Sequence, residues 1–410
     1  MLARTRVSSS IATSLSVHRR ALFSVVALAA LGCEAPAAIP DAGGTLDAAP
    51  LDAGADAPRP PDVCDELGLP RATFVSTGAG TALGAIAGDF TAATTRGPFT
   101  LSESFSGCES YVFFVHFPGR TDALVRTPPD ATFQEGPRNV RYFYVSDDAD
   151  AGARATLMGE LETSLEEGFG LFLATDEERA FWRARFHFIT DRATEVTGSV
   201  GTFLRDYLAY AATPAAVVDL GAGRGSSAPP LPVAFAIDRA QTWDPVDNLS
   251  PSVGEDPNLG MAAWLGHFYN YRFELESRLA SETGVTVVSL LDETTTGRVF
   301  TREVTLPAAV STADELTVDI VVDCRHGNHF GCSEWDRIAS VSFCVDGMPC
   351  TDRREIARWI TPYWRRGRQH YAIDASAFLG LFGSGGAQSF FVELGPDWER
   401  ATEWTTSVSL

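Results

Sequence analysis

The sequence predicts an α/β domain followed by an all-β sandwich. Between 64 and 283, buried-strand patterns alternate with helical patterns, which is typical of an α/β layout with at least a partly parallel sheet. Between 284 and 410, short stretches with period-two alternation follow one another closely, which is typical of an antiparallel sandwich. Ahead of both, residues 1–63 have a composition that predicts no folded domain.

The chain begins with a pattern typical of an export signal. Arg19 and Arg20 precede the apolar run ALFSVVALAALG, which is too short to cross a bilayer and has the order of a secretory leader. We therefore expect residues 1–32 to be a signal peptide. The residues ALGC resemble a bacterial lipobox in which Cys33 becomes lipidated and N-terminal, although Leu is more usual in the place of Ala30. The alternative is a cleaved leader with an ordinary cysteine nearby.

Residues 33–63 have the composition of a disordered tether. They are almost entirely Ala, Pro, Asp and Gly, with no aromatic side chain and too few large apolar ones to bury. A lipid, a tether and then folded domains is the layout of a bacterial lipoprotein. We therefore expect an exported protein, lipid-anchored in the outer membrane, at the cell surface or in the periplasm, that contacts the membrane through its lipid only.

The charge of the chain argues against one class of partner. Its formal net charge is −21, whereas binding nucleic-acid phosphates needs a basic face. Nucleic acid is therefore not an expected partner. The 410 residues are long enough for two domains after the tether.

The cysteines predict disulfides. Seven are present, and six remain when Cys33 is set aside. An even number in an exported chain favours disulfide pairing. Proximity in the sequence suggests three pairs and is informative for the first two: Cys324–Cys332, Cys344–Cys350 and Cys64–Cys108.

The α/β prediction depends on strand and helix patterns between 64 and 283. The strands are SYVFFVHF, NVRYFYVS, RARFHFIT and LPVAFAIDR, and the helices are DAGARATLMGELETSLEEG and MAAWLGHFYNYRFELESRLASE. Their order resembles the thioredoxin or peroxiredoxin fold, with GDFTAATTRGPFTLSES as the opening, YVFFVHF as the central strand and VAFAIDR as a later one. In that family the redox cysteines follow the central strand. Here HFPGRTDAL stands there and Cys108 precedes the strand, so we expect a scaffold or binding platform without redox activity.

A glycine-rich stretch in this domain imitates a cofactor loop. VVDLGAGRG (217–225) resembles the loop with which class I methyltransferases hold S-adenosylmethionine. Such a loop must open a helix, and Pro229, Pro230 and Pro232 prevent one here. We interpret it as a loop between two strands and expect no cofactor.

The sandwich prediction depends on short alternating stretches after 284. In LTVDIVVD, four apolar side chains share one face: Leu316, Val318, Ile320 and Val322. The further predicted strands are VTVVSLL, REVTLP, ASVSFC, YAID, SFFVEL and TEWTTSVSL. Many such strands with turns between them favour a sandwich.

One segment of the sandwich concentrates residues capable of chemistry. DCRHGNHFGCSEWDR (323–337) holds two cysteines and two histidines and ends in Glu-Trp-Asp-Arg, which contains the one glutamate of the segment. With EIARWITPYW and YAIDASAFLGLF after it, the segment resembles the first of the two jelly-roll domains of peptide-N-glycosidase F. The resemblance covers about Val285 to Leu410 and implies a jelly-roll sandwich.

The resemblance implies an active site. That family hydrolyses the amide between N-acetylglucosamine and asparagine, which leaves aspartate and a free glycan. Carried over, Asp336 is the principal catalytic carboxylate, with Trp335 and Arg337 beside the linkage. Glu393, in FFVELGPDW, is the candidate for a second carboxylate, because one carboxylate can handle protons while another orients water or the leaving nitrogen.

Further residues complete the predicted cleft. Glu334 shares a face with Asp336 if the segment is extended, and Trp364 shapes the substrate side. A Cys324–Cys332 disulfide would restrict the backbone between them.

The sequence also departs from the family. There, a further essential glutamate comes from the second jelly roll, which would begin where this sequence stops, so a partner protein would have to supply it. We therefore favour binding of N-linked glycan or glycopeptide without cleavage, with an active amidase and a structural envelope protein as alternatives. In the structural alternative, Trp335 and Trp364 are core aromatics and Asp336 with Arg337 is an ion pair that stabilises the fold.

His326 and His329 raise the question of a metal site. Copper monooxygenases of the same superfold need more histidines and a methionine, spread over several strands. The sandwich has Met348 alone, in a predicted disulfide turn. We therefore expect no metal and place the two histidines at the rim of a cleft.

Overall fold

The structure is a computed structural model. It describes residues 62–82, 84–119, 121–122, 130–211, 234–245, 260–294, 299–323, 338–361, 368–394 and 405–410. All of these belong to one compact unit that begins at Pro60. The predicted signal peptide, the lipidation of Cys33, the tether up to 61 and the glycine-rich loop 217–225 lie outside the described residues. Among the helices described, none is long and apolar enough to cross a membrane.

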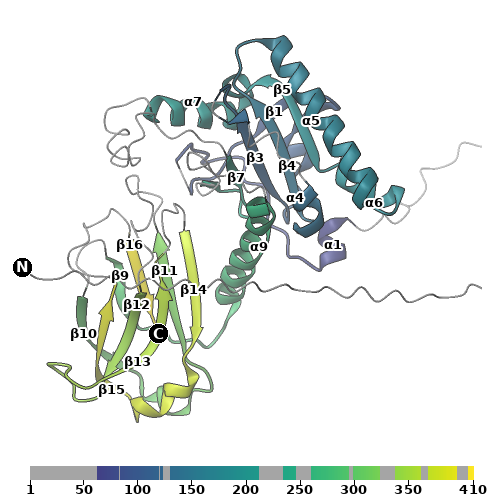
Figure 1. The fold of residues 1–410 in the computed structure, drawn as a ribbon. Coiled ribbons are helices and arrows are strands. Elements are labelled where there is room, and N and C mark those ends of the chain that lie inside the picture. Colours follow the sequence, from purple (N-terminus) through teal and green to yellow (C-terminus); the bar gives the residue numbers. More distant parts are fainter. Residues whose placement is uncertain are drawn as a thin grey trace, which may run out of the picture. The chain divides into compact units, whose positions relative to one another are not determined.

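The first part of the unit is built on a mixed sheet (Figure 1). Its strands run in the order β2-β1-β5-β4-β3-β7-β8, and β6 pairs with β1. The bounds are β1 Phe90–Thr94, β2 Gly97–Thr100, β3 Ser110–His116, β4 Val140–Ser146, β5 Phe186–Arg192, β6 Thr197–Gly198, β7 Ala234–Ile237 and β8 Trp243–Pro245. β3, β4 and β5 are parallel, whereas β7 is antiparallel to both β3 and β8. The predicted α/β layout with a partly parallel sheet is therefore confirmed.

Helices cover both faces of this sheet. They are α1 Val63–Leu67, α2 Leu101–Ser104, α4 Asp130–Glu135, α5 Ala151–Phe172, α6 Asp176–Arg183, α7 Ser199–Ala211 and α9 Gly260–Ser281, with the 3-10 turn η1 Ala193–Glu195. On one face, residues of α5 and α9 pack against Phe114 and Tyr142, and on the other, residues of α7 pack against Phe113 and Phe143. Burial on both faces explains why β3 is apolar at nearly every position rather than alternating.

The helix α5 runs beyond the predicted pattern, which ended at Gly168. It begins where Asp150 accepts hydrogen bonds from the backbone N–H groups of Gly152 and Ala153, and it continues to Phe172. Leu165 and Phe169 are fully buried, so apolar packing keeps the last turns helical despite the glycine.

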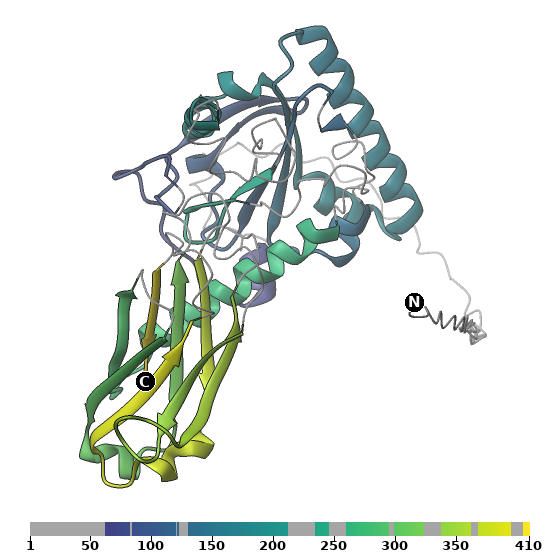
Figure 2. The same ribbon diagram turned by 60° about the vertical axis from the view of Figure 1, so that its left-hand side comes forward.

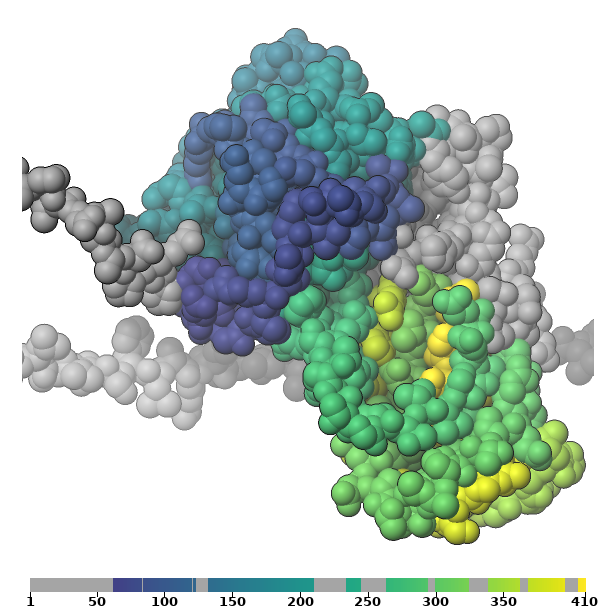
Figure 3. Space-filling view, turned by 180° about the vertical axis from the view of Figure 1, so that it is seen from behind, coloured from purple at the N-terminus to yellow at the C-terminus, as the bar shows by residue number. Residues whose placement is uncertain are grey.

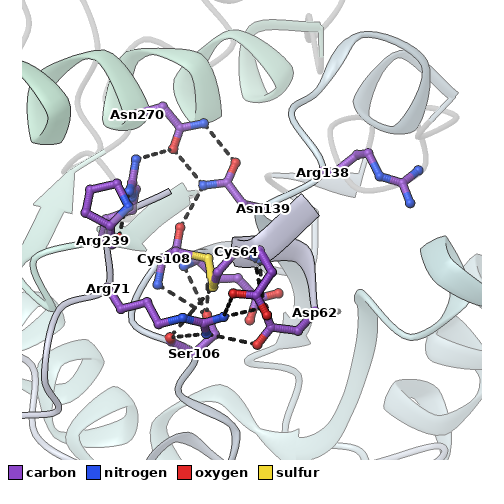
Figure 4. Close-up of a disulfide and its surroundings, with 12 residues drawn as sticks. Asp62, Cys64, Arg71, Ser106, Cys108, Arg138, Asn139, Arg239 and Asn270 are labelled. Atoms are coloured by element: carbon purple, nitrogen blue, oxygen red, sulfur yellow. Dashed lines mark hydrogen bonds and ion pairs between the residues drawn. A yellow bond between two sulfur atoms is a disulfide. The ribbon is translucent and has the colours of Figure 1, made fainter. Parts of the chain in front are cut away.

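The Cys64–Cys108 disulfide joins α1 to the residues that precede β3, in agreement with the prediction. Beside it, Asn139 Nδ2 donates to the carbonyl of Cys108 at 2.7 Å (Figure 4). Asn139 and Asn270 also exchange side-chain hydrogen bonds of 2.7 and 2.8 Å. These contacts attach the start of β4 to both the disulfide and α9.

The second part consists of two antiparallel four-stranded sheets, ordered β10-β15-β12-β13 and β14-β11-β16-β9. The bounds are β9 Ser289–Thr294, β10 Val299–Leu306, β11 Thr317–Asp323, β12 Ile338–Cys344, β13 Arg353–Ile360, β14 Arg368–Asp374, β15 Gly386–Glu393 and β16 Thr405–Ser409, with the 3-10 turns η4 Ala308–Thr312 and η5 Ser376–Phe382. Figure 2 shows the strands of this part as a ribbon. The two sheets share one apolar core, to which Val318, Val341 and Phe390 contribute. The predicted alternation in β11 is confirmed, because Val318, Ile320 and Val322 are fully buried.

Two strand predictions in this part need correction. The pattern VTVVSLL predicts a strand from 285, whereas β9 begins at Ser289. Val288 still exchanges backbone hydrogen bonds with Leu410, but Val285 and Val287 are exposed. The sequence pattern also did not single out β13 as a strand, although Ile356, Ala357 and Trp359 bury their side chains in the core.

Candidate functional site

Strand ends from both sheets gather at one end of the β part. In one sheet, Asp323 stands opposite both Arg368 and Thr405. In the other, Ile338 stands opposite Ile360, and Glu393 stands opposite Ser340 and Val299. The segments between β11 and β12, between β13 and β14, and between β15 and β16 therefore all connect to this end, which we call the loop end.

Most of the predicted site residues belong to these connecting segments. Outside the described residues lie Cys324, His326, His329, Cys332, Glu334, Trp335, Asp336, Arg337 and Trp364. In the chain, Arg337 directly precedes Ile338, the first residue of β12, and Trp364 lies between β13 and β14. The assignment of roles to these residues therefore stays a prediction.

Glu393 is the predicted site residue that the structure describes. It is the last residue of β15 and is exposed. Its neighbour Val392 is buried in the core, so the alternation of the strand points Glu393 to the outer face. Within the described part of the chain, its carboxylate has no ion-pair partner, which leaves it available to hydrogen-bond donors from solvent or a ligand.

A cluster that sequence reasoning missed joins α9 to the sheet that contains β14. His370 on β14 contacts two carboxylates: its Nε2 lies 2.5 Å from Asp319 Oδ1 on β11, and its Nδ1 lies 3.3 Å from Glu276 Oε1 on α9. Burial opposes the imidazolium charge, but the two carboxylates outweigh burial and raise the pKa of His370 to about 9. His370 is therefore cationic at neutral pH and donates to both carboxylates.

Arg272, one turn before Glu276 on α9, forms a second buried cluster. Its guanidinium contacts Asp238, lies 3.1 Å from Asp244 Oδ2, and donates to the backbone carbonyl of Arg368 at 3.3 Å. All three charged side chains are nearly fully buried. Burial opposes the charge of Arg272, but Asp244 and Asp238 outweigh it and raise its pKa. α9 therefore connects the turn between β7 and β8 to the first residue of β14.

Together the two clusters hold β11 and β14, and both strands border the loop end. Their members lie far apart in the sequence, for example 94 residues between Glu276 and His370 and 51 between Asp319 and His370. No local spacing could have predicted them. Their chemistry is that of structural ion pairs, which position strands rather than transform a substrate.

A second constellation lies at the carboxyl ends of the parallel strands. His116 ends β3 and Ser146 ends β4, where ligands bind in many open α/β sheets. His116 Nδ1 lies 2.8 Å from Ser146 Oγ, and His116 Nε2 lies 3.0 Å from Asp122 Oδ1, a contact that lowers the pKa of Asp122. The groups are those of a serine hydrolase triad, but Ser146 is fully buried and no substrate carbonyl can reach its oxygen. We interpret them as a buried histidine with both nitrogens satisfied.

The remaining predictions concern cysteines and metals. The structure forms the predicted Cys344–Cys350 disulfide, and the predicted Cys324–Cys332 pair lies outside the described residues. Within the ranges that the structure covers, no three histidine, cysteine or carboxylate side chains gather as a metal site would require.

Comparison with solved structures gives a partial structural likeness. The chain is similar to the crystal structure of a peptide-N(4)-(N-acetyl-β-D-glucosaminyl) asparagine amidase, with 24% sequence identity and a TM-score of 0.24. The match covers 30% of this chain and 41% of the amidase chain, so it spans less than half of that enzyme. No family model and no curated protein matches the sequence. The thioredoxin resemblance stays a prediction.

Proposed function

We propose that this chain is an exported lipoprotein whose C-terminal part is a jelly roll similar to that of peptide-N-glycosidase F, and that it binds N-linked glycan or glycopeptide at the loop end. One observation carries the proposal. The segments that contain Asp336 and Trp364, and the strand that ends at Glu393, all meet the sandwich at the same end. The residues predicted to form one cleft thus belong to segments that connect to strand ends at the same end of the sandwich.

The path of the chain through the two sheets supports the jelly roll. From β9 to β16, each strand lies in the opposite sheet from the one before it, except for the β12–β13 pair. Eight strands divided in this way between two antiparallel sheets are typical of a jelly roll. The resemblance in sequence and the strand order therefore favour the same fold independently of each other.

We favour binding over hydrolysis, and the experiments below distinguish the two. The described part of the loop end offers the exposed carboxylate of Glu393 for hydrogen bonds to sugar hydroxyls. In this proposal, Trp335 and Trp364 contact the sugar rings, Asp336, Arg337 and Glu334 contact the linkage, and a partner protein carrying a second jelly roll would complete an amidase. The α/β part, with its thioredoxin-like order, serves as a platform.

Titration of the full chain, with its disulfides formed, into a defined N-linked glycopeptide tests the proposal. Calorimetry should detect binding that Trp335→Ala or Trp364→Ala weakens at least tenfold. Trp264→Ala is the matched control, because Trp264 is a 64% exposed tryptophan that belongs to α9 and to none of the segments that connect at the loop end. Equal binding by all three variants, or no binding by the unaltered chain, would refute a glycan site at the loop end.

The same samples distinguish the amidase alternative. Mass spectrometry would follow the conversion of the glycosylated asparagine to aspartate together with the release of free glycan. A binding protein should give no conversion and should keep most of its affinity in Asp336→Asn. Conversion that disappears in Asp336→Asn would establish an active amidase instead, since the proton-handling carboxylate is then essential. A structural envelope protein would give neither binding nor conversion.

A further inference from the structure

A cavity of about 670 Å³ lies at the opposite end of the β part from the loop end. One wall is the segment 282–288 that follows α9, and the other consists of η4 and the residues 313–316 after it. Thr317 and Asp319 of β11, together with Ser409 of β16, line its floor. Figure 3 shows a hollow beside α9 on this side of the molecule. The volume falls within the range of about 300–1,000 Å³ that is usual for ligand sites.

The wall 282–288 offers unpaired backbone groups. Gly284 has a φ of +77° and open space around its Cα, which lets the chain change direction after α9. The segment then continues toward β9, the edge strand of its sheet. Val288 pairs with Leu410, but within the described residues no backbone hydrogen bond involves 284–287. A segment of this kind beside a cavity can pair with an added strand.

The apolar side chains of this wall are exposed to solvent. Val285 is 57% exposed and Val287 is 69% exposed, and both line the cavity. Further apolar side chains lie around them, including Leu279, Leu306 and Leu379. An occupant with apolar side chains would remove this surface from water, which is favourable by about 25 cal/mol per Å².

The charged side chains known to line the cavity are all acidic. They are Glu282, Asp314, Glu315 and Asp319, and among the described residues no lysine, arginine or histidine lines the cavity. Glu282 pairs with Arg278, and Asp319 pairs with His370. Asp314 and Glu315 have no ion-pair partner among the residues described, so they remain to attract a cation.

We propose that this cavity binds an extended peptide segment of a partner protein that carries both basic and apolar side chains. Its backbone pairs with 284–287, its apolar side chains contact Val285 and Val287, and its basic side chains face Asp314 and Glu315. This peptide site is independent of the glycan site, because the two lie at opposite ends of the sandwich.

The probe is a capped five-residue peptide in which leucine and valine alternate with arginine and lysine. A second peptide has glutamate in both basic positions. Calorimetry on the full chain should detect the basic peptide and not the acidic one. Asp314→Asn combined with Glu315→Gln should weaken binding about tenfold, because it removes both unpaired charges. Val285→Thr combined with Val287→Thr should also weaken it, since these changes keep the shape and remove apolar surface.

The control is Glu167→Gln combined with Glu303→Gln. Both glutamates are exposed and neither lines the cavity, so this variant loses the same charge elsewhere on the molecule. It should bind the basic peptide as the unaltered chain does. Hydrogen exchange should show slower exchange of the amides in 285–287 when the peptide is present.

Three results would overturn the proposal. The first is equal loss of binding in the lining and control variants, which would mean that the net charge of −21 attracts the peptide without a site. The second is binding of the acidic peptide as strong as that of the basic one. The third is no binding of the basic peptide at millimolar concentration. All three results can be measured whether or not the chain binds the glycopeptide, so a failure of the proposed function would not decide the test of the peptide site.

Discussion

Replacing Arg272 by methionine should destabilise the protein far more than the same change at Arg278. Both residues lie on α9, and methionine keeps a long side chain in a helix. Arg272 is nearly fully buried between Asp238 and Asp244, whereas Arg278 is exposed and pairs with Glu282 at 2.7 Å. Arg272→Met would remove the guanidinium that both buried carboxylates contact. Removing one partner of a buried pair costs about 3–5 kcal/mol, whereas an exposed pair contributes about 0–1 kcal/mol.

Urea unfolding at pH 7, followed by circular dichroism, measures both variants. We expect the free energy of unfolding to fall by about 3 kcal/mol or more for Arg272→Met and by less than about 1 kcal/mol for Arg278→Met. The loss for Arg272→Met should shrink in acid, because the two carboxylates that lose the guanidinium can then take up protons. If the two variants lose the same stability at pH 7, α9 is not held by a buried ion pair and the account of the Arg272 cluster is wrong.

Three further predictions concern pH and disulfides. The pKa of His370 is raised from 6.5 to about 9, so its contribution to stability is present below pH 6.5 and is lost as the pH rises through 9. Urea unfolding at pH 6.5 and pH 9 should show this fall in the unfolding free energy for the unaltered chain, and His370→Gln should abolish it. The pKa of Asp62 is lowered from 3.8 to about 2, first of all by its hydrogen bond from Arg71, so its contribution to stability is present above pH 3.8 and is lost toward pH 2. Arg71→Gln should weaken this dependence of the unfolding free energy on pH, and an unchanged acid profile would contradict the prediction. The Cys64–Cys108 disulfide closes a loop of 44 residues and the Cys344–Cys350 disulfide a loop of 6. Replacing both cysteines of a pair by serine should therefore lower the free energy of unfolding by about 4 kcal/mol for the first and about 2 kcal/mol for the second, and the reverse order in calorimetric unfolding would contradict this.

Local patterns predicted most of the strands and helices because those elements bury one face or both. SYVFFVHF could be assigned as a buried strand since β3 is covered by helices on each side, and LTVDIVV because β11 buries every second side chain. The predicted start of β9 was wrong for a related reason. Val285 and Val287 alternate with polar residues as strand residues do, but they line an open cavity instead of a sheet core. An alternating pattern reports apolar side chains and does not show what covers them.

For the candidate site too, local patterns in the sequence could predict some residues and not others. Glu393 could be singled out because it stands at the end of an apolar strand, and the structure places it on the outer face of that strand. The clusters of His370 and Arg272 could not be foreseen, since their partners come from separate elements that meet only when α9 packs beside β14. Ser146, His116 and Asp122 show the opposite case. Their residue types fit a triad, and burial of the serine decides against it.

Hydrogen exchange of the full chain with and without an N-linked glycopeptide tests the central claim most directly. The glycan site at the loop end predicts slower exchange in the fragments that contain Asp336, Trp364 and Glu393, and unchanged exchange in 284–288. The same peptide without its glycan should have no effect at these fragments. Slower exchange confined to another region, or none at a saturating glycopeptide concentration, would contradict a glycan site at the loop end.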